Sequence, residues 1–507
     1  MHRTIPIVFL LFLGSQAWGQ PPGFVRDSLD GYIARGMFDW QIPGMAVLIV
    51  KDGKVVLMRG YGVANRETGE VVNEKTLFLI ASNTKLFTAT ALSQLNYDKR
   101  ISLDDPYTKY FPDFRLYDPT STRLVTIRDL LCHRIGTRGF AGDFSFWNSR
   151  LSASEVVGKM RLIKGDRVFR QSYGYCNSCF LAAGQVIPNV TGLPWASYVR
   201  DSLLAPLQMQ ATFFSPREIP VELTLAKPYT TSFSPALVPT RYDRWDNLAP
   251  AAAIISNLSD LSHWLLFQLD GGRYGGGQVV PSAVLDSTRN INIYLTRNAS
   301  NGLPTHFIAY GLGVMISDYN GRRLYGHTGG SSGMVSSLCF VPEERLGIVI
   351  LSNKDDQDFC KALQYQLLDA YLGVSYVNRS EGYLKEYRED RRATLSAIDG
   401  WMKRVGRREP PLPLAAYAGV YANALYGTIN IGMIGKHLVV RFNEHDSLTA
   451  RLDYMDNGEW LLKFDNVEYG VFATRFKVAG DKVVSVETKQ SETVEYGVYE
   501  FRRSPTH

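Results

Sequence analysis

Two kinds of hydrophobic pattern divide the chain. In the first part, apolar runs over 45–50 and 55–58 flank an Asp-Gly pair, which predicts a β-hairpin. A 3.6-residue period over 82–95 predicts a helix, and the spacing of Thr126 and Asp129 fits a capping box that opens another. Further strands are expected at 311–316, 336–341 and 346–351, and further helices at 25–37, 256–266 and 359–372.

These strands lie early and late in the first part, with mainly helical sequence between about 150 and 270. That order favours one antiparallel sheet that is completed by both ends of the part and flanked by helices. We therefore predict an α/β (α+β) domain over 20–375 with a helical subdomain.

The second part begins where the pattern changes, near residue 376. The stretch 376–413 is charged and ends in prolines, which predicts a helical linker with a stiff end. From 414 to 507, six or more short strands are separated by turns, and this spacing predicts a small all-β barrel or sandwich.

The first 19 residues have the features of a signal peptide. Arg3 precedes an apolar run over 5–13, and Ala17 and Gly19 supply the small residues that a signal peptidase needs. We expect cleavage before Gln20 and a secreted or periplasmic mature protein. An uncleaved membrane anchor is the alternative, although the apolar run is short for a bilayer span.

Composition and charge narrow the classes of function. A hydrophobic share of 45% and a charged share of 21% are typical of a soluble globular protein. A net charge of +6 over 507 residues, with no long basic tract, argues against nucleic-acid binding. Cys176 and Cys179 form a C-x-x-C, but no second pair completes a metal site, so buried thiols or a structural disulfide are expected instead.

Three short motifs carry candidate chemistry. Ser82 and Lys85 form an S-x-x-K, and residues three apart on a helix share a face. The lysine amine can therefore accept the serine hydroxyl proton once the pKa of the lysine is lowered. Tyr175 and Asn177 form a Y-x-N, which offers a phenol for proton transfer and an amide for hydrogen bonding. The third motif is H-T-G-G at 327–330, where a backbone N–H beyond a glycine turn can face an oxyanion.

Each motif alone is common, but in this order they resemble the serine β-lactamase and penicillin-binding-protein superfamily. The chain is most similar to the branch of class C β-lactamases, D-aminopeptidases and esterases. The resemblance implies a β-lactamase-like fold over most of 24–372. The region after 414 resembles the lipocalin-like β-barrel that is appended to some of these hydrolases, with its opening at 417–421 and 425–427. Stretches at 131–136, 250–256, 310–313 and 326–330 also agree with the superfamily.

By that resemblance, Ser82 attacks the substrate carbonyl and forms an acyl-enzyme. Lys85 and Tyr175 share the proton transfers, and Asn177 positions the lysine and a substrate amide. The N–H groups of Ser82 and Gly330 form the oxyanion hole, and water then releases the acyl group.

Two histidines lie near these motifs in the sequence. We expect a structural role for His133, because the lysine and tyrosine already supply the base. His327, with Thr328 and Gly329, is expected to border the substrate. Many members of the superfamily have a lysine there, facing a substrate carboxylate, whereas histidine is mostly neutral at pH 7. A weaker dependence on a substrate carboxylate follows, which argues against an efficient β-lactamase.

The sequence therefore predicts a secreted serine hydrolase of peptide, amide or ester substrates, D-amino-acid peptides among them. The alternatives are a β-lactamase or D-Ala-D-Ala carboxypeptidase, and a non-hydrolysing sensor of β-lactams or muropeptides that stays acylated. A barrel-dominated binding protein is disfavoured because no motif residue is missing. No metal, organic cofactor or nucleic-acid partner is implied. The barrel could bind a ligand, cover the active site, join copies into a homo-oligomer or serve packing alone.

Overall fold

The computed structural model describes residues 20–299 and 302–505. The predicted signal peptide over 1–19 lies outside the described residues. Within the described ranges, no helix is long and apolar enough to cross a membrane.

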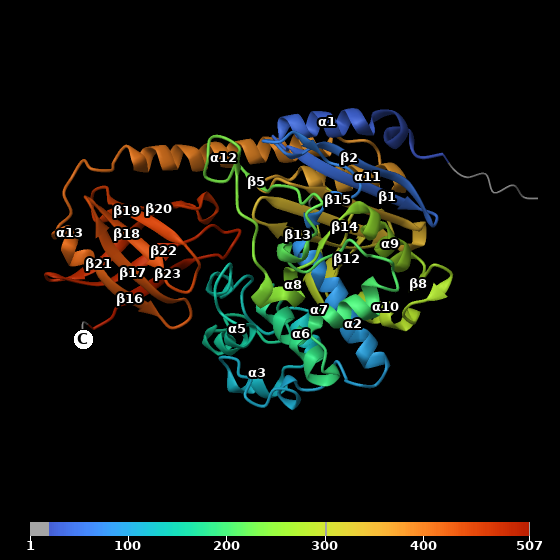
Figure 1. Cartoon of the computed structure of the whole chain (residues 1–507), viewed down its shortest axis with the longest axis horizontal. Helices are drawn as coiled ribbons and strands as arrows, with labels where there is room; N and C mark the ends of the chain where they lie inside the picture. The colour runs from blue at the N-terminus through green and yellow to red at the C-terminus, as the bar shows by residue number, and fades with distance from the viewer. Residues whose placement is uncertain (1–19, 300–301, 506–507) are drawn as a thin grey trace, which may run out of the picture.

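A nine-stranded antiparallel sheet forms the centre of the first part (Figure 1). The N-terminal hairpin pairs directly with a late strand, since Met45 lies opposite Ser352 in the register. The sheet is therefore completed by both ends of this part, as the order of elements predicted. In spatial order its strands are β10 (Ile293–Thr296), β11 (Ile308–Tyr310), β12 (Met315–Tyr319), β13 (Arg322–Ser331), β14 (Met334–Val341), β15 (Leu346–Ser352), β1 (Gly44–Lys51), β2 (Lys54–Asn65) and β3 (Glu70–Val71).

Both faces of the central strands are buried, which explains the unbroken apolar run of β1. Its odd-numbered residues, Met45 and Val47 among them, pack against α1 (Leu29–Asp39) and α11 (Phe359–Leu372). Its even-numbered residues belong to the larger core on the other face. That face is covered by α2 (Thr84–Tyr97) and α9 (Leu258–Leu269), beyond which the helical subdomain extends (Figure 1).

Short helices build the helical subdomain around α6 (Asn177–Thr191). The predicted capping box is confirmed, because Thr126 and Asp129 exchange side-chain and main-chain hydrogen bonds at the start of α4 (Ile127–Leu131). The remaining helices are α3 (Pro119–Leu124), α5 (Ala153–Lys159), α7 (Trp195–Val199), α8 (Ala249–Ala252) and α10 (Ser282–Arg289).

The strand predicted at 311–316 is wrong over 311–314. The chain turns there between β11 and β12, and Gly313 has a φ of +70°. A Cβ on Gly313 would lie 2.5 Å from the carbonyl oxygen of Lys85. The apolar residues of this stretch are buried in a turn that packs on the start of α2, so a strand-like composition misled the sequence pattern.

The C-terminal part is a closed barrel of eight antiparallel strands. Six of them were predicted from sequence, and β16 and β19 were not, because their alternation is short and mixed with polar residues. The strands are β16 (Gly419–Asn423), β17 (Gly427–Ile434), β18 (His437–Phe442), β19 (Thr449–Tyr454), β20 (Glu459–Phe464), β21 (Val471–Ala479), β22 (Lys482–Lys489) and β23 (Val498–Arg503).

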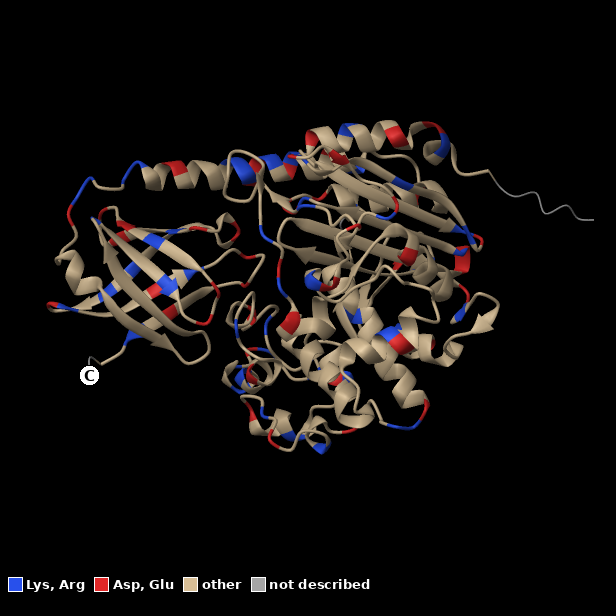
Figure 2. Ribbon diagram, in the orientation of Figure 1, with Lys and Arg blue, Asp and Glu red and all other residues tan. Residues whose placement is uncertain are grey.

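One long helix, α12 (Arg379–Met402), joins the two parts, followed by the short α13 (Leu414–Tyr417). The helix runs from the sheet to the barrel, and basic and acidic residues are interspersed over its first part, 379–392 (Figures 1 and 2). The loops of the barrel then turn back onto the helical subdomain. The main-chain N–H of Arg150 donates to the carbonyl of Glu444, and Lys159 donates to the carbonyl of Leu425. The barrel is thus in contact with the first part of the chain at more points than its linker.

Candidate active site

Ser82 lies in a tight 3-10 turn, Ala81–Asn83, directly before α2. Ala81 has a φ of +45°, a left-handed conformation that is strained for any residue with a Cβ. Two contacts hold the turn: the main-chain N–H of Ile80 donates to the carbonyl of Ile254, and Asn83 donates to Ser336. The helix predicted from Ser82 therefore begins two residues later, and the serine is presented on the turn.

Lys85 is fully buried beside the serine hydroxyl. Its Nζ lies 2.9 Å from Ser82 Oγ, 2.8 Å from Asn177 Oδ1 and 3.0 Å from the carbonyl oxygen of Ala251. A neutral amine has two N–H groups and one lone pair, so the two oxygen acceptors leave the lone pair for the Ser82 proton. Burial lowers the pKa of Lys85 to about 7, which makes that neutral form accessible near neutral pH.

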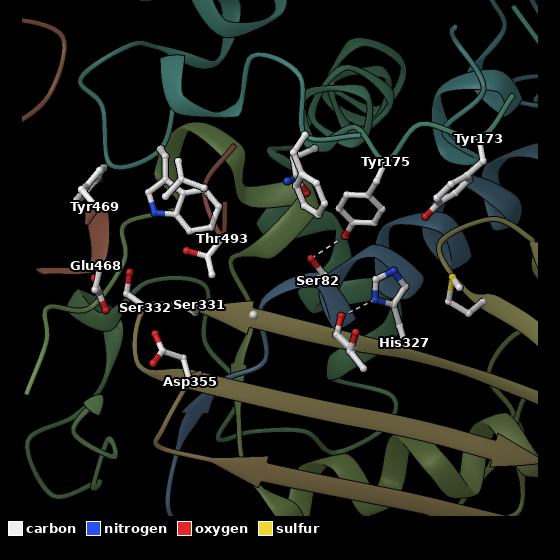
Figure 3. A pocket seen from close by; sticks show the side chains of 17 residues that line it. Ser82, Tyr173, Tyr175, His327, Ser331, Ser332, Asp355, Glu468, Tyr469 and Thr493 are labelled. Carbon is white, nitrogen blue, oxygen red and sulfur yellow. Dashed lines mark hydrogen bonds between the residues drawn. The ribbon is translucent and has the colours of Figure 1, made fainter. Parts of the chain in front are cut away.

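Tyr175 approaches the serine from the opposite side. Its hydroxyl donates to Ser82 Oγ over 2.8 Å, as Figure 3 shows. Burial raises the pKa of Tyr175 well above its usual value. The phenol therefore keeps its proton in the resting site, and Lys85 is the group that is ready to act as base.

Asn177, the first residue of α6, links the lysine to a buried carboxyl group. Its Oδ1 accepts from Lys85, and its Nδ2 donates to Asp143 Oδ2 over 2.6 Å. Burial, with repulsion from Glu495, raises the pKa of Asp143 well above its usual value. The second N–H of the Asn177 amide is left for a substrate.

The H-T-G-G motif lies within β13 and not in a turn, which corrects the sequence prediction. Gly329 is required by packing, because a Cβ there would lie 2.1 Å from the carbonyl oxygen of Ile80. A Cβ on Gly330 would have no heavy atom of the described residues within 4 Å, so the space above this face of the strand is open. Gly330, Thr328 and Ser82 all border one cavity, the place that the oxyanion-hole prediction requires.

His327 is held in a single neutral tautomer. Its Nδ1 lies 2.6 Å from the carbonyl oxygen of Thr328, which can only accept, so Nδ1 carries the proton. Its Nε2 then accepts from the Tyr310 hydroxyl, 2.9 Å away. Burial and the charge of Lys85 lower the pKa of His327 to about 3. This position therefore holds no cation in the physiological range of pH.

His133 is buried behind the site. Its Nδ1 accepts a hydrogen bond from the main-chain N–H of Cys176 over 3.0 Å. The centroids of the His133 and Tyr175 rings are 4.4 Å apart. The Nε2 of His133 has no hydrogen-bond partner among the described residues, so the ring is bonded to neither Ser82 nor Lys85. The position agrees with the predicted supporting role.

The cavity has a volume of about 460 Å³ and is lined from both parts of the chain. Figure 3 shows Ser82, Tyr175 and His327 toward one end, and Glu468 and Tyr469 of the barrel toward the other. Sequence reasoning placed Tyr310 in a stretch that resembles the superfamily but gave it no role, and it missed the barrel residues as well as Asp143 and Asp355. No motif connects them, since they approach the site only through the tertiary fold.

A family model described as Beta-lactamase matches residues 29–371. The chain belongs to the beta-lactamase family. Its large antiparallel sheet with flanking helices has the beta-lactamase-like fold that the motifs implied. A second model, described as a domain of unknown function (DUF3471), matches residues 403–503, which include the barrel.

Relatives and solved structures agree with this family. Protein flp of Staphylococcus aureus is 27% identical over 345 residues, which are 67% of this chain, and the chain spans only 65% of that relative's length. An unguisins hydrolase of Aspergillus violaceofuscus is 27% identical over 448 residues, 82% of this chain and 78% of the relative.

The solved structures support the fold over nearly the whole chain. An octameric penicillin-binding protein homologue from Pyrococcus abyssi has a TM-score of 0.62 at 20% identity, covering 94% of this chain and 99% of that one. SurE with D-Leu has a TM-score of 0.56 at 18% identity, covering 95% and 100%.

Proposed function

We propose that this beta-lactamase family member is an exported hydrolase of peptide, amide or ester bonds that acts through an acyl-enzyme at Ser82. The observation that carries the proposal is the contact of one serine oxygen with two proton-transfer groups. Lys85 lies 2.9 Å and Tyr175 2.8 Å from Ser82 Oγ. A hydroxyl between a neutral amine and a protonated phenol is an activated nucleophile with an acid beside it.

The protonation states of Ser82, Lys85 and Tyr175 determine the order of the reaction steps. Ser82 Oγ bonds to the substrate carbonyl carbon while its proton passes to the lone pair of Lys85. The N–H groups of Ser82 and Gly330 would hold the oxyanion of the tetrahedral intermediate. When the intermediate collapses, the leaving group takes a proton from the Tyr175 phenol. Lys85 then gives Tyr175 the proton that it received from Ser82. Water then attacks the acyl-enzyme, with Lys85 again as base.

Peptides that contain D-residues are the substrates we favour. Support comes from the neutral state of His327, which offers no fixed cation to the carboxylate of a β-lactam. The similar protein SurE, whose structure was solved with D-Leu, supports the D-residue, and the relative named unguisins hydrolase supports hydrolysis. The β-lactamase, carboxypeptidase and sensor hypotheses remain the alternatives to be tested.

Export and assembly are also part of the proposal. The features of residues 1–19 support signal-peptide cleavage before Gln20 and a periplasmic or secreted protein. The octameric homologue from Pyrococcus abyssi supports a homo-oligomer. Light scattering of the protein from Gln20 onward would measure its mass against that of a single chain.

The deciding experiment is turnover by the protein from Gln20 onward, with Ser82→Ala as its control. D-alanyl- and L-alanyl-nitroanilide and a neutral nitrophenyl ester would be offered in parallel. Release that depends on Ser82 supports the hydrolase, and the D/L ratio gives its stereochemistry. No release, together with stable labelling of Ser82 by a fluorescent penicillin, would contradict it in favour of the sensor.

A further inference from the structure

The end of the cavity away from Ser82 carries two carboxyl groups from separate parts of the chain. Asp355 follows β15, and Glu468 lies in a 3-10 turn of the barrel, Val467–Tyr469. Figure 3 shows both side chains next to Ser332, along the cavity from the nucleophile.

Each of these carboxyl groups has one buried oxygen that is without a hydrogen-bond partner among the described residues. Asp355 Oδ2 accepts from the main-chain N–H of Gly333 over 2.9 Å, but Oδ1 accepts nothing. Glu468 is only 7% exposed, and its Oε1 also accepts nothing. Leaving a buried acceptor unpaired is costly, so both oxygens indicate a donor that a bound molecule supplies.

A neighbouring buried carboxylate, Asp243, has a purely structural role and serves as a comparison. Asp243 is 1% exposed and accepts hydrogen bonds from the hydroxyl of Ser331, from both the N–H and the hydroxyl of Ser332, and from the amide of Asn148. Its oxygens are saturated by the protein itself. Asp355 and Glu468 differ from it in facing the cavity with free acceptors.

Among the described residues, no cationic side chain contacts the unpaired oxygens of Asp355 and Glu468. Burial, with repulsion from neighbouring acids, raises the pKa of Asp355 to about 6 and that of Glu468 to about 8. Lys354 is close, but its ammonium donates to the main-chain carbonyls of Asp355 and Asp356 and to no carboxylate. A cation bound in the cavity would relieve the repulsion.

An organic ammonium fits this site better than a metal ion. No group of three His, Cys, Asp or Glu residues in the described part of the chain could hold a metal ion. A primary ammonium instead offers three N–H donors, enough for both unpaired oxygens. Trp147 and Tyr469 line the same cavity, and aromatic rings also attract a cation.

The distance from the reacting carbonyl is set by the β13–β14 hairpin. Gly330 is the predicted oxyanion residue, and Gly333, three residues on, donates to Asp355. Three extended residues span at most about 10 Å, so we expect the ammonium within about three residues of the scissile carbonyl.

We propose that Asp355 and Glu468 form a subsite for the ammonium group of the substrate. The substrate class is therefore peptides or amides with a free amino terminus, or a basic side chain, within about three residues of the bond that is cleaved. This inference deepens the proposed function and rests on it. It also gives the barrel a direct part in substrate selection, because Glu468 is a barrel residue.

Binding can be measured without turnover in a Ser82→Ala protein. Isothermal titration calorimetry would compare alanyl-alaninamide with its N-acetyl form, using D- and L-compounds in parallel. We expect the free amine to bind at least about tenfold more tightly, as a charge-assisted hydrogen bond predicts. Equal affinity of the free and acetylated compounds, or no binding of the amine at millimolar concentration, would overturn the proposal.

Variants of Asp355 and Glu468 test whether these two acids cause the preference for a free amine. Glu468→Gln and Asp355→Asn, each combined with Ser82→Ala, are expected to remove most of the preference for the free amine. Glu492→Gln is the matched control, since Glu492 is an exposed acid near the same barrel loop. A preference that persists in both cavity variants would refute the assignment. If a variant fails to fold, the comparison of amine and acetylated compounds in the Ser82→Ala protein still decides the question.

Failure of the inference can be told from failure of the proposed function. Hydrolysis of neutral esters that depends on Ser82, with no preference for an amine, would leave the hydrolase standing and remove the subsite. Amine-selective binding without turnover of any substrate would do the reverse.

Discussion

Glu495, on the loop between β22 and β23 of the barrel, accepts a hydrogen bond of 2.7 Å from the main-chain N–H of Gly142 in the hydrolase part. Its other oxygen accepts from the N–H of Phe144 over 3.0 Å. Asp143 lies between these two donors and holds Asn177, which in turn holds Lys85. The barrel thus fixes the main chain on both sides of Asp143, whose side chain is linked to Lys85 through Asn177.

Glu495→Ala is expected to weaken both the fold and catalysis. The substitution leaves the buried N–H groups of Gly142 and Phe144 without their acceptor, which should cost about 3 kcal/mol of stability. Because Asp143 loses its support, kcat should fall about tenfold while KM changes less. Thermal unfolding and steady-state kinetics would measure both effects, with Glu492→Gln as control. Wild-type kcat in Glu495→Ala would show that the barrel loop does not position the site.

The dependence of kcat on pH should report Lys85. Its pKa of about 7 means that the base is protonated at lower pH, so kcat for a neutral ester should fall about tenfold per unit below pH 7. It should level off above that value, since the amine is then neutral. Lys85→Arg should lose at least about a hundredfold at every pH, because a guanidinium keeps its proton. A flat profile between pH 5 and 8 would assign the base to another group.

The three motifs could be found from sequence because each is local. The S-x-x-K spacing places Ser82 and Lys85 together on one turn, and Tyr175 and Asn177 are two residues apart at the start of α6. The overall order of strands and helices could also be predicted, since β1 is apolar on both faces and Leu86, Ala89 and Leu92 recur at a helical spacing in α2. Local patterns of this kind need no knowledge of distant contacts.

The rest of the site depends on contacts that no spacing rule describes. Glu495 and Gly142 are 353 residues apart, and the left-handed conformation of Ala81 is imposed by packing on a residue type that rarely adopts it. The turn around Gly313 looked like a strand because its neighbours are apolar. Such features follow from tertiary packing, which overrides local propensity.

The five cysteines are expected to be inert thiols. Cys132, Cys176, Cys179, Cys339 and Cys360 are all free and buried. A thiol reagent should therefore label none of them in the native protein and all five after denaturation. Reductant should leave both the melting temperature and the activity unchanged. Fast native labelling, or a mass lower by two hydrogens that reductant reverses, would restore the disulfide expectation for the C-x-x-C pair.

His327 should decide how the site treats a substrate carboxylate. Its proton is fixed on Nδ1 by the Thr328 carbonyl, and its pKa of about 3 keeps the ring neutral from pH 5 to 8. Benzylpenicillin and a neutral ester should therefore show acylation profiles of the same shape over that range. His327→Lys should raise the acylation rate with benzylpenicillin about tenfold relative to the ester, because an ammonium would then face the carboxylate. His327→Gln, which adds no charge, is the matched control, and an equal gain in both variants would mean that space rather than charge limits penicillin binding.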